Sequence, residues 1–125
     1  MTIAQQKAVA AGDSSSTALT SFTVTFDSAP AAGSVLYAAC AADKGVGAWT
    51  TPGGWAVAVE YVNANVSQAV YYRVSDGTET GVTFAWSTAI RFAGGYLREE
   101  AGVTVTGMPS PAAANSASSN VTSIA

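Results

Sequence analysis

The stretch VSQAVYYRVSDGTETGVTFAW, residues 66–86, decides the fold class of this chain. On either side of its polar centre, apolar side chains recur at every second position, which is the period of a β-strand with one face in a core. The centre, residues 75–81, is polar and carries two glycines, which allow the backbone conformations that a chain reversal needs. The stretch therefore predicts a β-hairpin of two antiparallel strands, around which the remaining chain packs.

The same period of two recurs in residues 17–27, 55–61 and 90–96. We therefore predict an all-β fold, a single antiparallel β-sandwich of about seven or eight strands. The predicted core residues are Phe22, Val24, Phe26, Leu36, Trp55, Val57, Tyr72, Val74, Phe84 and Trp86.

Residues 34–42, SVLYAACAA, are apolar at consecutive positions rather than at alternate ones. Strands of this kind are covered on both faces. Within one small sandwich, the second cover would be a loop, a tail or another subunit. Further along, Gly94 and Gly95 interrupt the run AIRFAGGYLREE and predict a bulge or a close approach of another backbone.

The chain divides into three parts. We expect residues 1–16 to form an N-terminal arm or edge strand, residues 17–108 the β-sandwich domain, and residues 109–125 an extended C-terminal arm. The last part is rich in Ala, Ser and Pro and has almost no large apolar residue with which to form a core. Terminal segments of this kind are ordered only where something ties them down, so we expect a neighbouring chain to hold this arm.

Composition excludes some partners. Only 10% of the 125 residues are charged, which predicts a neutral, hydroxyl-rich surface. Five basic residues against eight acidic ones, never clustered, offer no footprint for a phosphate backbone, so we expect no nucleic acid partner. No stretch approaches the about 20 apolar residues of a membrane span, and the N-terminus lacks the pattern of a signal peptide. We expect a protein that is made in, and soluble in, the cytoplasm, with no membrane partner.

The residue types that carry most enzyme chemistry are missing. The chain has no histidine and one cysteine, Cys40, which removes Ser-His-Asp and Cys-His catalysis, an internal disulfide and a zinc site. Nothing in the sequence places two carboxylates at a working separation for glycoside hydrolysis. We interpret Cys40 as a small buried residue rather than a reactive thiol. The prediction is a protein without enzyme activity and without a cofactor.

Asp76 and Glu79 lie in one polar loop and could join carbonyl oxygens around a calcium ion. Two carboxylates without further Asp or Asn nearby make a weak ligand set. A plain polar turn is therefore the favoured interpretation, and no metal site is predicted.

Trp49 lies outside any alternating run, in the irregular connection of residues 43–54. It either caps the edge of the sandwich or projects as a contact residue. The candidate partner contacts of the whole chain are Trp49, Lys44, Tyr71, Arg73, Pro109, Pro111, Val121 and Ile124.

Two pieces of the chain carry a resemblance: PGGW at residues 52–55, and AVYYRVSDGTET at residues 69–80, which leads into VTFAW at residues 82–86. They resemble a jelly-roll-type β-sandwich module of tailed-bacteriophage virion proteins, of the capsid-decoration and the tail- or head-fibre type, which is also seen in bacterial surface proteins. The resemblance covers about residues 17–105, and its motifs are structural, so no functional residue is carried over. It implies a jelly-roll-like fold and a non-catalytic structural or adhesive role.

Two functions are expected from these observations. The first is a bacteriophage virion structural protein of the capsid-decoration or attachment type, which is made in the host cytoplasm and binds a major capsid or tail protein and copies of itself. The second is a carbohydrate- or receptor-binding adhesion module of a tail fibre or bacterial surface protein. In that case Trp49 and neighbouring tyrosines would serve as stacking platforms for a host-surface glycan.

Overall fold

A computed structural model describes residues 5–6, 11–13 and 18–100 of the chain. Over these residues, every helix or strand assigned is a β-strand. The strands are β1 (Gln5–Gln6), β2 (Ala11–Asp13), β3 (Leu19–Thr25), β4 (Val35–Ala42), β5 (Trp49–Thr50), β6 (Ala56–Tyr61), β7 (Ser67–Val74), β8 (Gly81–Ile90) and β9 (Ala93–Glu100).

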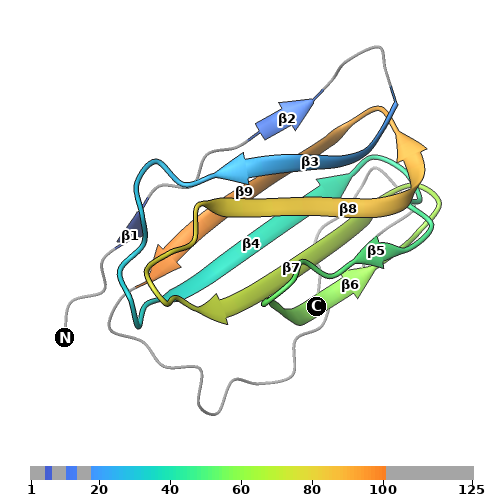
Figure 1. Ribbon diagram of the computed structural model, residues 1–125. Helices are drawn as coiled ribbons and strands as arrows, with labels where there is room; N and C mark the ends of the chain where they lie inside the picture. Colours follow the sequence, from blue (N-terminus) through green and yellow to red (C-terminus); the bar gives the residue numbers. More distant parts are fainter. Residues whose placement is uncertain (1–4, 7–10, 14–17, 101–125) are drawn as a thin grey trace.

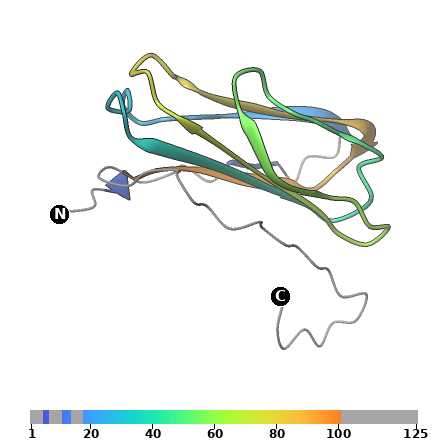
Figure 2. The same cartoon turned by 90° about the horizontal axis from the view of Figure 1, so that it is seen from below.

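The strands form two sheets that lie one over the other as two layers (Figure 1, Figure 2). The large sheet has the order β1-β9-β4-β7-β6, with β2 also paired to β9, and the small sheet has the order β3-β8-β5. The strand pairs of the described residues are all antiparallel. The predicted all-β, antiparallel fold is therefore confirmed, and its two layers are arranged like a sandwich.

The two short N-terminal strands, β1 and β2, pair with the edge of β9 that faces away from β4. They belong to residues 1–16, which were expected to form an arm or an edge strand, and they extend the large sheet beyond β9. The expected C-terminal arm, residues 109–125, lies outside the described residues.

The predicted hairpin of residues 66–86 is wrong in its pairing. β7 lies in the large sheet between β4 and β6, whereas β8 lies in the small sheet between β3 and β5. The polar β7–β8 connection crosses from one sheet to the other, and Gly77 within it takes a φ of 88°. Both strands show a period of two because each has one face in the same core, on opposite sides of it. This period is the same whichever strand is the hydrogen-bonded neighbour, so it cannot predict the pairing.

The predicted inward face of β7 is also wrong. Tyr71 has no exposed surface, whereas Val74 is 52% exposed and Tyr72 is only half-buried. The ring of Tyr71 stacks on Phe84 of β8 with 6.3 Å between centroids, and its hydroxyl donates to Glu60 Oε1 at 2.9 Å. The run AVYYRV is apolar on both faces, so its alternation could not choose between them.

Most of the remaining core predictions are confirmed. Four of the predicted residues are buried, namely Val24, Leu36, Phe84 and Trp86. Two more pack half-buried against the core, namely Phe26 and Trp55. Val57 is wrong, since it is 44% exposed on the edge strand β6, where the pairing with β7 is irregular between Val57 and Val59. The side chain of Phe22 lies outside what the structure describes.

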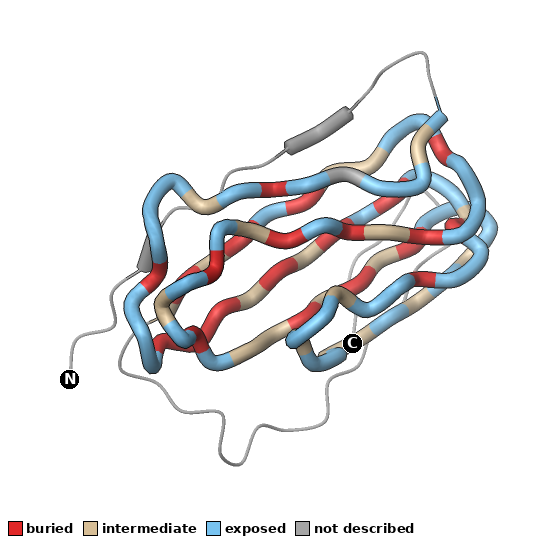
Figure 3. Tube along the Cα trace, in the orientation of Figure 1, coloured by how far each residue is buried: buried red, intermediate tan, exposed pale blue. Residues whose placement is uncertain are grey.

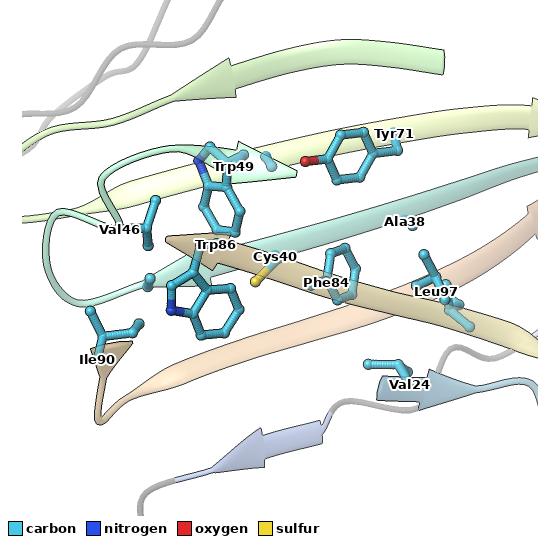
Figure 4. Close-up of a cluster of buried hydrophobic side chains, with 13 residues drawn as sticks. Val24, Ala38, Cys40, Val46, Trp49, Tyr71, Phe84, Trp86, Ile90 and Leu97 are labelled. Atoms are coloured by element: carbon cyan, nitrogen blue, oxygen red, sulfur yellow. The ribbon is translucent and has the colours of Figure 1, made fainter. Parts of the chain in front are cut away.

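Buried residues lie along the strands of both sheets (Figure 3), and in the core bulky side chains of one sheet pack against small ones of the other (Figure 4). The small sheet contributes Val24, Trp49, Val82, Phe84 and Trp86. Opposite them, the large sheet contributes four small side chains, Ala38, Cys40, Ala42 and Ala69. It also contributes two larger ones, Tyr71 and Leu97. Large side chains on one layer fill the space that small ones leave on the other, as close packing requires.

Candidate functional site

The outer face of the large sheet points away from the small sheet. Cross-strand partners share a face, so the burial of Ala38, Tyr71 and Leu97 in the core places the intervening residues of β4, β7 and β9 on the outside. The outer face consists of Tyr37, Ala39, Ala41, Gln68, Val70, Tyr72, Gly94, Tyr96, Arg98 and Glu100. No described element lies over it (Figure 2). The second cover that residues 34–42 predict is therefore not formed by the described part of the chain.

A shallow hollow of about 540 Å³ lies on the outer face. Its floor is backbone and small side chains, because Ala39 and Ala41 of β4 run beside Gly94 of β9. Tyr96 lines the hollow and is 46% exposed. Gly94 and Gly95 predicted a bulge or a close approach of another backbone; the bulge is absent, since both glycines pair in regular register with β4. Their missing side chains instead open the sheet surface to an approaching group.

A small polar group lies at one end of the outer face. Arg98 Nη2 forms an ion pair with Glu100 Oε1 at 2.8 Å, and both residues share a second hollow of about 290 Å³ with Tyr37 and Tyr96. Burial and, to a smaller extent, the charge of Glu100 raise the pKa of Tyr37. The charge of Arg98 lowers it by a smaller amount, so the pKa is raised overall. Tyr37 is therefore a neutral hydrogen-bonding group near pH 7. The outer face thus combines aromatic rings, an apolar floor and an ion pair whose charges cancel. Such a surface is better matched to another protein surface than to a highly charged ligand.

Two of the predicted contact residues are core residues in the structure. Trp49 is 9% exposed, packs edge-on against Trp86 with 5.7 Å between ring centroids, and donates from Nε1 to the backbone oxygen of Tyr61 at 3.1 Å (Figure 4). Trp49 therefore packs against the sandwich and does not project as a contact residue. Burial of Tyr71, followed by its hydrogen bond to Glu60 and the charge of that carboxylate, raises its pKa. Neither aromatic ring is a surface contact.

Lys44 is exposed, as a contact residue has to be. It lines a hollow of about 330 Å³ with Arg91, Phe92 and Asp43, where β8 turns into β9. Phe92 is 45% exposed, and Cζ of Arg91 lies 6.0 Å from the centre of its ring. Two cations beside an exposed ring could bind a carboxylate-bearing group, although Asp43 offsets part of their charge.

Arg73 is engaged within the molecule. Its Nε lies 3.0 Å from Glu79 Oε1, and its Cζ lies 6.0 Å from the centre of the Trp55 ring. Glu79 is buried and accepts hydrogen bonds from the Ser75 hydroxyl at 2.6 Å and from the Asp76 amide at 3.0 Å. Burial by itself raises the pKa of Glu79, but these hydrogen bonds and the charge of Arg73 outweigh it, so the pKa is lowered. The connection thus has the geometry of a polar turn braced by Arg73.

Two further chemical groups are buried by the fold. Glu99 Oε2 accepts hydrogen bonds from the Ala31 amide and the Ser34 hydroxyl, both at 2.6 Å, and so ties the loop before β4 to β9. Cys40 is 3% exposed, and burial raises the pKa of its thiol to about 12. The interpretation of Cys40 as a small buried residue is confirmed.

The sequence reasoning missed the tyrosines of the outer face. Tyr37 and Tyr96 were not among the candidate contacts, and Tyr72 was assigned to the core. The available signals were the two-sided apolar run of residues 34–42 and the Gly94-Gly95 pair. Sheet order is needed to connect them, because it places β9 and β7 on either side of β4. The other four predicted contacts, Pro109, Pro111, Val121 and Ile124, lie outside the described residues.

Among residues 5–6, 11–13 and 18–100, no group of three or more His, Cys, Asp or Glu side chains could hold a metal ion. Within the same residues, no helix is long and apolar enough to cross a membrane. Comparison with protein-family models, with curated proteins and with solved structures finds no match to this chain.

Proposed function

We propose that this chain is a non-catalytic structural protein of a bacteriophage virion, of the capsid-decoration or attachment type. Its sandwich is jelly-roll-like and sits in symmetric copies on a capsid or tail lattice. The arm of residues 109–125 reaches across a subunit boundary. The observation that carries this proposal is the apolar, tyrosine-bearing outer face of the large sheet.

The outer face supports a role in assembly because of its chemistry. Contiguous apolar patches on soluble domains mark surfaces that bind other proteins. Tyr37, Tyr72 and Tyr96 offer broad rings whose hydroxyls can still form hydrogen bonds at the rim of a contact. A particle in which each copy has fixed neighbours supplies the cover that this face lacks among the described elements.

The class of particle is supported by the sequence. Residues 52–55 and 69–86 resemble modules of phage virion proteins, and a charged fraction of only 10% suits dense packing of identical copies. An extended arm adds main-chain contacts with a neighbour. Many copies on one lattice convert weak single contacts into firm attachment.

The test is reattachment to capsids or tails of the parent phage that lack this chain. We expect the full chain to bind them and a chain without residues 109–125 to lose binding, while its Tm stays nearly unchanged because the sandwich is intact. The control is Ser21→Arg, an exposed position of β3 on the other sheet, which should bind normally. Full occupancy by the truncated chain would refute the arm, and failure of the full chain to bind any virion part would refute the virion role.

The alternative is an adhesion module that binds a host-surface glycan. It is favoured by one observation, the hollow where Phe92 is exposed beside Arg91 and Lys44. A sugar ring could stack on Phe92 while its carboxylate pairs with the two cations. Binding to an array of acidic glycans that is lost in Phe92→Ala, but kept in Tyr96→Ala, would establish this function. No binding to any glycan would exclude it.

A further inference from the structure

We propose that two copies of this chain pack outer face to outer face, with Tyr96 of each copy over the hollow of the other. The inference goes beyond the proposed function, because it concerns the isolated protein in solution. It assigns the occupant of the outer face to a second copy of the same chain.

The first argument is that one face carries both a projecting group and a matching hollow. On β9, Tyr96 is 46% exposed, and Gly94, two positions away, forms part of the floor of the hollow of about 540 Å³. Residues two apart on a strand are separated by about 7 Å and share a face. A contact between identical patches requires such self-complementarity.

Sheet register shows how a twofold axis would use this pair. Cross-strand partners place Ala39, Val70 and Tyr96 in one row and Ala41, Gln68 and Gly94 in the next. Consider a twofold axis that lies in the plane of the interface and runs across the strands, between these two rows. It places the first row of one copy over the second row of the other. Each Tyr96 then lies over the partner copy's glycine, where no side chain blocks the ring.

The outer face, taken together with the neighbouring strand β6, just reaches the size that a specific interface needs. β4, β7 and β9 have eight residues each, and β6 adds a fourth, shorter strand. Four strands about 4.8 Å apart and about 27 Å long give a footprint of roughly 500 Å² per copy. Two such faces reach about 1,000 Å², which is the lower limit for a specific interface. The contact is therefore large enough for a weakly associating dimer.

Sedimentation of the full chain over a concentration series tests this inference. The wild-type chain should form a dimer, and both Tyr96→Ala, which removes the ring, and Ala41→Arg, which fills the hollow, should raise the dissociation constant about tenfold or more. Both positions are exposed, so the variants should keep the circular dichroism of the parent. Ser21→Arg on the opposite sheet should dimerise like the wild type.

A wild-type chain that stays monomeric to millimolar concentration would overturn the inference and leave the face to another occupant. A dimer that survives both outer-face substitutions, or that is lost equally in Ser21→Arg, would overturn it too, because the contact would then lie elsewhere. Lattice attachment is measured separately, so either proposal can fail without the other.

Discussion

Two adjacent tyrosines allow a sharp test of which face of β7 lies in the core. Tyr71→Ala removes a ring with no exposed surface that stacks on Phe84 and donates to Glu60. Burial of roughly 150–250 Å² at about 25 cal/mol per Å² gives about 4–6 kcal/mol as an upper bound. Replacing a large aromatic core residue by Ala typically lowers the free energy of unfolding by about 3–5 kcal/mol, so we expect a loss in this range. Tyr72→Ala, on the half-buried outer face, should cost about 1 kcal/mol or less.

Urea unfolding followed by tryptophan fluorescence measures both variants, since Trp49 and Trp86 lie in the core. The protein should be kept dilute enough that self-association does not contribute. In a thermal melt, the same loss of stability in Tyr71→Ala should lower the Tm by roughly 10–20 °C. Tyr71→Phe keeps the ring and should cost only about 1 kcal/mol through the lost hydrogen bond. Equal losses in the two alanine variants, or a larger loss in Tyr72→Ala, would show that the assigned inward face of β7 is incorrect.

Three further predictions concern single positions. Glu79 has a lowered pKa in the folded state, so its charge adds stability that is present above its ordinary pKa and is lost as pH falls through the folded value. Glu79→Gln should therefore be less stable than the wild type at pH 7, and the difference between their urea midpoints should narrow below about pH 4. A difference that stays constant down to pH 3 would contradict this prediction. Cys40, with a pKa of about 12 and 3% exposure, should react with a thiol reagent at pH 7 only after unfolding, and rapid labelling of the native protein would disprove its burial. Gly81→Ala should destabilise the protein by about 1–3 kcal/mol, because the added Cβ would meet the backbone oxygen of Val24, while Gly53→Ala, whose Cβ meets nothing, should behave as the wild type.

The sequence determined the fold class and several core positions of this protein. Alternation of Val82, Phe84 and Trp86 predicted a strand with one buried face, and all three residues are buried. This works because a pleated strand turns successive side chains to opposite faces, whatever its neighbours are. The burial of Cys40 could be predicted for a similar reason, since a small thiol among apolar residues has no polar partner to keep it at the surface.

The partners of each strand and the candidate contact surface were decided only by the tertiary structure. β7 and β8 read as a hairpin, yet they face each other across the core, because a period of two is the same for both arrangements. The two apolar sides of β7 could be ranked only once Tyr71 was seen to meet Phe84 and Glu60. The outer face gathers β9, β4 and β7, which are distant in sequence, so its hollow and its tyrosines arise from long-range pairing that no local pattern encodes.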